Sequence, residues 1–66
     1  MNARERISQR IASELGILQG MLEAETSLRD SLVELGQPEG FKTAKMRYFE
    51  DQIDRLRRMQ KAGKEA

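Results

Sequence analysis

Three carboxylates in the last third of the chain have the types and spacing that could do chemistry. Glu50, Asp51 and Asp54 fall within about one turn of a predicted helix. A carboxylate can orient a water molecule for attack on a substrate. The chain has no histidine and no cysteine, which excludes a nucleophilic triad and a zinc-type metal-water site. We therefore expect no metal and no cofactor.

The carboxylates also have a simpler interpretation. Arginines lie three or four residues from them, at positions Arg47, Arg55 and Arg58. This spacing is typical of ion pairs on an exposed helix surface, each worth a few tenths of a kcal/mol. The pattern therefore favours a solvated charged face over a catalytic centre.

A line of small residues is the second unusual feature. Ser8, Ala12, Gly16, Gly20 and Ala24 recur every four residues. A glycine inside a helix costs up to about 1 kcal/mol relative to alanine, and close approach of another backbone would offset this cost. We interpret the line as a self-association or partner surface. The alternative is that the first of these glycines marks a kink or a break in the helix.

Two helices must position these residues. Asn2 and Glu5 form a capping-box-like start, and apolar residues then recur at helical spacing as far as Leu35. Gly36 and Pro38 are typical of residues that follow a helix end. A second periodic run follows, and no stretch alternates with a period of two. The sequence thus predicts an all-α antiparallel helical hairpin.

The predicted hairpin has a helix over about 3–35, a turn over 36–40 and a helix over about 41–61. It forms a single domain over 1–66, with residues 62–66 expected to fray. Because the first helix is predicted to be longer, its first ten or so residues should lack an intrachain partner. Ile7 and Ile11 would then need cover from another molecule.

The chain is short for a self-sufficient fold. A single core in 66 residues seldom supplies more than about 3–5 kcal/mol of stability. Disulfides and metals are excluded by composition, so oligomerisation remains as the supplement. We expect a homo-oligomeric helical bundle, with a four-helix bundle as the simplest form. Six residues make up the predicted oligomer or partner interface: Ile7, Ile11, Ala12, Gly16, Gly20 and Ala24.

Charge is distributed unevenly although the net charge is only +1. Residues 11–40 hold six acids and one base, and residues 42–64 hold eight bases and three acids. The plain interpretation is two helices of opposite charge lying side by side. The alternative is a basic second helix that contacts nucleic-acid phosphates or an acidic partner. Its contact residues would be Lys42, Lys45, Arg55, Arg57, Arg58 and Lys61.

Part of the chain resembles a known family. Leu28-Arg29-x-x-Leu32-x-Glu34-Leu35, Gly40-Phe41 and Gln52-Ile53-Asp54-Arg55-Leu56 resemble the small helical-hairpin aspartyl-phosphate phosphatases of sporulation response regulators. The family signature has a serine and a glutamine where this chain has Glu50 and Asp51, and an isoleucine where it has Arg57. The resemblance implies that Asp54, or Asp51, orients water for hydrolysis of a receiver domain's acyl phosphate.

Taken together, these features favour a non-enzymatic regulatory or inhibitory binding module that acts through helix-mediated protein–protein interaction. The first residues lack the apolar core of a signal peptide, so we expect a cytoplasmic protein, acting in the host cytosol if a phage or another mobile element encodes it. No apolar run approaches the length of a membrane span. Two alternatives stay open: a nucleic-acid-binding hairpin oligomer, and an aspartyl-phosphate phosphatase.

Overall fold

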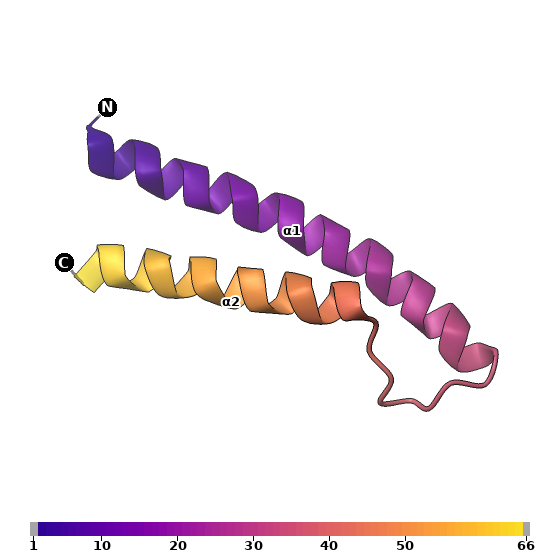
Figure 1. The fold of residues 1–66 in the computed structure, drawn as a ribbon. Helices are drawn as coiled ribbons and strands as arrows, with labels where there is room; N and C mark the ends of the chain where they lie inside the picture. Colours follow the sequence, from indigo (N-terminus) through magenta and orange to yellow (C-terminus); the bar gives the residue numbers. More distant parts are fainter. Residues whose placement is uncertain (1, 66) are drawn as a thin grey trace.

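The protein is a hairpin of two antiparallel helices (Figure 1). The computed structural model describes residues 2–65, with side chains over 2–63. Helix α1 spans Ala3–Glu34 and helix α2 spans Ala44–Glu65. The described residues contain no strand, so the predicted all-α hairpin is confirmed.

Local hydrogen bonds set both ends of α1. Asn2 has extended backbone angles, and its Oδ1 accepts a hydrogen bond from the Glu5 amide at 2.8 Å. At the other end Gly36 adopts a positive φ of 122°. The Gly36 amide donates to Val33 O at 3.1 Å and the Gln37 amide to Leu32 O at 3.0 Å. This is the Schellman arrangement that satisfies the last carbonyls of a helix, and it confirms the predicted helix end.

Helix α1 continues without interruption through its two internal glycines. A Cβ atom built on Gly16 or Gly20 would have no heavy atom within 4 Å. The alternative of a helix break at Gly16 is therefore wrong. Neither glycine is required by packing within the hairpin.

Helix α2 begins three residues later than the predicted position 41. The Phe41 amide donates to Pro38 O at 2.9 Å, so residues 38–41 form a turn. The Thr43 hydroxyl then accepts from the Met46 amide at 3.1 Å, which is N-cap geometry. Phe41 fits the spacing of the apolar residues of α2, and for this reason the sequence-based prediction placed the start of α2 too early. The helix extends to Glu65 rather than ending near residue 61. Fraying of the tail stays a prediction, and residue 66 lies outside the described residues.

The small core lies between the first two thirds of α1 and the length of α2. Ile11, Leu15 and Ile53 form one buried cluster, and Met46 is buried separately. Leu18, Leu22 and Leu56 pack against the cluster while remaining partly exposed. No described side chain is fully buried. This core is small for a chain that must fold alone.

The predicted uncovered part of α1 is only partly uncovered: Ile7 is 57% exposed, as expected, but Ile11 is not. Helix α2 starts beyond the middle of α1, before its last turns, and ends beside its first turns (Figure 1). Ile11 is 7% exposed because α2 covers it, so the prediction that Ile11 has no intrachain partner is wrong. The last turns of α1 instead extend past α2, where Leu28 is 51% exposed.

The loop over 35–43 returns beside this overhang and is held there by one arginine. Arg29 Nη1 donates to Glu39 O at 2.9 Å, and Arg29 Nη2 pairs with Asp30 Oδ1 at 2.7 Å. Glu25 lies four residues before Arg29, a spacing that favours an ion pair, but the ion pair of Arg29 is with Asp30 instead. Its Nε atom is buried without a hydrogen-bond partner. Arg29 thus holds the loop beside the last turns of α1.

The molecule is a rod rather than a sphere. Its principal extents are 51 × 18 × 13 Å and its radius of gyration is 15.3 Å. A compact domain of this length has a radius of gyration of about 11 Å. Two helices alone cannot enclose an interior, so a large share of their apolar surface stays in contact with solvent.

Candidate functional site

The carboxylates of α2 form surface ion pairs. Asp51 Oδ2 lies 3.6 Å from Arg55 Nε, and Asp54 Oδ2 lies 2.7 Å from Arg58 Nη2. Both aspartate side chains are more than half exposed. Glu50 is paired instead with Lys42 at 3.1 Å. The ion-pair interpretation is confirmed, and within residues 2–63 no three acidic side chains group closely enough to hold a metal ion.

The six residues of the predicted interface do not form one surface. Ala12, Gly16, Gly20 and Ala24 are exposed. Ile11 is buried against α2. Ile7 is exposed, but it lies in the arc of α1 near the buried residues rather than on the small-residue line. Whether any of the six contacts a second molecule stays a prediction.

A larger uncovered surface lies on one side of the helix pair. On α1, helical spacing places Ile7, Ile17, Met21 and Leu28 within an arc of about 80°, and each is about half exposed or more. We call these four side chains, together with the two exposed apolar side chains of α2, the open face. The two side chains of α2 are Tyr48 and Met59.

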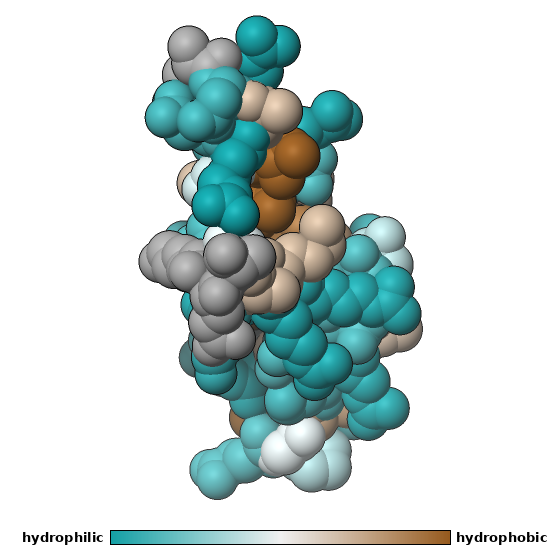
Figure 2. Space-filling model, turned by 90° about the vertical axis from the view of Figure 1, so that its left-hand side faces the viewer, coloured by the Kyte–Doolittle hydropathy of each residue, from teal (hydrophilic) through white to brown (hydrophobic). Residues whose placement is uncertain are grey.

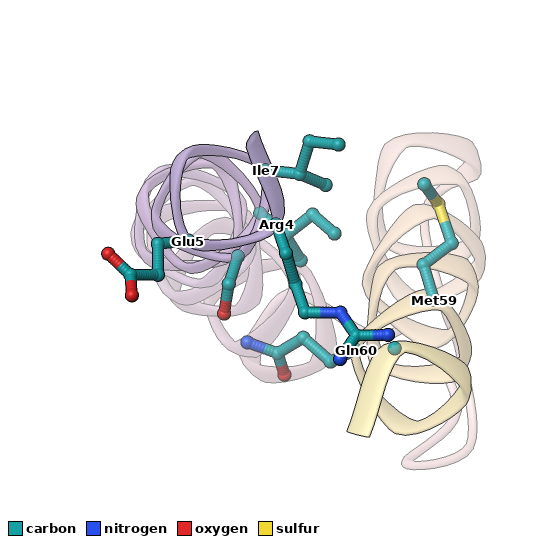
Figure 3. A pocket seen from close by; sticks show the side chains of 8 residues that line it. Arg4, Glu5, Ile7, Met59 and Gln60 are labelled. Carbon is teal, nitrogen blue, oxygen red and sulfur yellow. The ribbon is translucent and has the colours of Figure 1, made fainter. Parts of the chain in front are cut away.

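The two helices contribute to the open face together. Ile17 and Met21 of α1 line a shallow hollow with Tyr48 and Gln52 of α2. Near the chain ends, Ile7 and Met59 lie on the same side of the helix pair (Figure 3). Tyr48 is 59% exposed, so it lies on the surface of the hairpin rather than in its core. Its ring instead packs edge-on against Phe49, with centroids 5.8 Å apart.

The sequence pattern contained the signal for this face. The apolar residues of α1 form a stripe broader than one partner helix can cover. Helix α2 takes only the arc that contains Ile11, Leu15, Leu18 and Leu22. The rest of the stripe is left on the open face.

A hollow of about 630 Å³ lies between the two helices where they diverge toward the chain ends. We call it the end hollow. Ile7, Ile11 and Met59 supply its apolar lining, and a brown patch is visible between teal surfaces in the view from this side (Figure 2). The Arg4 side chain reaches toward α2 beside Gln60, whereas Glu5 points away (Figure 3).

Charge is separated along the rod rather than across it. The open end, which we define as residues 2–10 and 55–63, carries seven bases and one acid, a formal balance of +6. Residues 11–54 carry nine acids and four bases, a balance of −5. Among the described side chains, none of the ion pairs joins α1 to α2. No ion pair of the described residues therefore supports the expected pairing of an acidic helix with a basic one, which stays a prediction.

The six bases of the predicted nucleic-acid surface are divided by this arrangement. Lys42 and Lys45 lie near the start of α2, and Lys42 is bound to Glu50. Arg57 and Lys61 lie at the open end instead. The first turns of α1 add three arginines to that end, which the sequence-based prediction left out: Arg4, Arg6 and Arg10.

Comparison with protein-family models, with curated proteins and with solved structures found no match for the chain. Neither described helix combines the length and the apolar character needed to cross a membrane. Function must therefore be argued from the surfaces themselves: an open face, an end hollow, a small-residue line and a basic open end.

Proposed function

We propose that this protein is a non-enzymatic regulatory or inhibitory binding module that acts by packing its helices against those of other protein molecules, including its own copies. The observation that carries the proposal is the imbalance between covered and uncovered apolar side chains. Four hydrophobic side chains are buried, while seven large ones are exposed among the described residues. Exposed apolar surface gathered on one side of a small protein is typical of an interaction site.

The arrangement of the acidic side chains supports a binding role over a catalytic one. Asp51 and Asp54 each face an arginine four residues onward, and neither lines the end hollow or the hollow beside Tyr48. A general base must reach its proton in a site where substrate can be positioned. The phosphatase reading therefore has the resemblance of the sequence in its favour but no supporting geometry.

Photo-crosslinking in cells tests the proposed function. A benzophenone amino acid is placed at Ala12 on the small-residue line, at Met21 on the open face and at Lys61 at the open end. We expect discrete protein adducts, insensitive to nuclease, in addition to any adduct with the protein's own copy. Adducts that consist only of the protein's own copies, or that form at Lys61 and disappear with nuclease, would contradict the proposal.

The basic open end supports nucleic-acid binding as a second candidate function. Three of its seven bases are held in ion pairs, and the others, Arg4, Arg6, Arg57 and Lys61, could neutralise phosphates. Each neutralised phosphate releases counterions. Binding of an RNA or DNA oligonucleotide should then weaken steeply as salt is added. Replacement of Arg4 and Arg57 by glutamine should flatten this salt dependence, whereas replacement of the ion-paired Lys42 should leave it unchanged.

A further inference from the structure

The open face has no partner within the chain, and the form and charge of the molecule indicate what covers it. We propose that a second copy of the hairpin packs on the open face in an antiparallel orientation, giving a four-helix bundle. This inference rests on the proposed function, because it specifies the self-association included there. It places the contact on Ile17, Met21 and Tyr48 rather than on the small-residue line.

The exposed area matches what a stable dimer needs. The chain exposes 5286 Å², whereas a compact monomer of its mass exposes about 4,300 Å². The excess is about 1,000 Å² per chain. A standard protein–protein interface covers about 800 Å² on each partner. A second copy that covers the open face would therefore bring the molecule to the surface expected of a compact protein.

The shape of the face suits a second identical rod. The face runs along the helix pair from Ile7 and Met59 near the chain ends to Leu28 beyond the start of α2. A two-fold axis across its middle would pass close to Ile17 and Tyr48. The same residues of both copies then meet there, as an isologous interface requires.

Charge complementarity selects the antiparallel orientation. The open end carries a formal balance of +6 and the remainder of the hairpin −5. Three bases of the open end pair with acids just beyond its boundary, and the two parts keep opposite signs when these acids are counted with the open end. In an antiparallel pair each basic end lies beside the acidic loop end of the other copy, which is attractive. A parallel pair would instead align two basic ends, and like charges placed together disfavour a complex. Met59 of one copy should therefore lie near Leu28 of the other.

Sedimentation equilibrium of the purified chain tests the face. We expect a dimer whose dissociation constant rises by about tenfold or more in Ile17→Ser combined with Met21→Ser, because two apolar side chains lose their burial. Gln9→Ser combined with Gln19→Ser alters exposed positions away from the open face and should leave the dimer unchanged. Circular dichroism confirms that the variants remain helical. A monomeric wild-type chain, or equal effects of the two pairs, would overturn the proposal.

Two further measurements test the orientation. The dissociation constant of an antiparallel dimer should increase with added NaCl, because salt screens the attraction between unlike ends. A constant that is unchanged or falls with salt would contradict this orientation.

The chain has no cysteine of its own, so engineered cysteines report the geometry directly. When a Leu28→Cys chain is mixed with a Met59→Cys chain, oxidation should give mainly the mixed disulfide. A predominance of Met59→Cys homodimers would contradict the antiparallel arrangement. These assays use purified protein alone. A dimer without any other cellular partner would refute the proposed function but keep this inference. A monomer that binds another protein in cells would refute this inference but keep the proposed function.

Discussion

Replacing both internal glycines of α1 with alanine should stabilise the protein. Gly16 and Gly20 lie inside a continuous helix, and a Cβ at either position would meet no heavy atom within 4 Å. Each substitution removes the backbone freedom of a helical glycine, which is worth about 0.5–1 kcal/mol. The double variant should therefore gain about 1–2 kcal/mol, a large fraction of the stability expected of so small a core.

Thermal unfolding followed by circular dichroism measures this gain. In a domain of this size each kcal/mol shifts Tm by about 4–8 °C. All variants must be compared at one chain concentration, because self-association makes Tm depend on concentration. Gly36→Ala is the matched control, since it adds the same methyl group in equally open space but at a φ of 122°. That backbone conformation is strained for alanine, and the control should lose about 1–3 kcal/mol.

The result that would refute this reasoning is a double variant less stable than the wild-type chain, or one whose dimer is weaker. Either outcome would mean that another backbone approaches the small-residue line closely, so that added methyl groups collide with it. The interface would then lie on the line as the sequence pattern predicted. The open face would need a different occupant.

Two remaining predictions concern the core and the acidic cluster. Ile53→Ala should lower the free energy of unfolding by about 2–4 kcal/mol through loss of packing, because Ile53 is the residue of α2 in the buried cluster. Circular dichroism should show a largely unfolded chain. An unchanged Tm would show that another contact holds the hairpin together. Asp54→Ala should change stability by less than about 0.5 kcal/mol, because its pair with Arg58 is exposed, and should not alter the decay of a phosphorylated receiver domain. A wild-type protein that accelerates this decay, with loss in the variant, would restore the phosphatase interpretation.

The helix ends of α1 could be predicted because they depend on neighbouring residues. The Asn2 cap and the turn at Gly36 are local hydrogen-bond arrangements that the sequence specifies within a few positions. The start of α2 is also local, and Thr43 was the available signal. The apolar spacing that includes Phe41 indicated an earlier start than Thr43 does. Periodicity locates the face of a helix more reliably than its first residue.

The register of the two helices could not be predicted in the same way. It depends on how far the loop travels along α1 before α2 begins, and Arg29 holding Glu39 O contributes to that distance. A contact between a helix residue and a loop residue ten positions later leaves no periodic pattern in the sequence. The mistaken overhang at Ile11 followed directly from the assumption of a tight turn.

Register also determines the charge of the open end. Had α2 begun immediately after a tight turn, its basic C-terminal half would lie beside the acidic middle of α1, where Glu14 and Glu23 are placed. The loop over 35–43 moves α2 toward the start of α1, so that Arg57 and Lys61 lie level with the first turns instead. Bases then gather on both helices at the end where the helices diverge.

A single hairpin therefore has two unfavourable features with one common origin. The register that covers Ile11 and Leu15 also brings like charges together at the open end and leaves Leu28 uncovered near the loop. Tightening the hairpin would not correct both, because a shift that neutralised the bases would uncover the core. The antiparallel second copy that we propose would correct both without any change in the hairpin, since its acidic loop end would meet the basic end and its apolar face would meet the open face. This is why we expect stability and self-association to be inseparable in this protein.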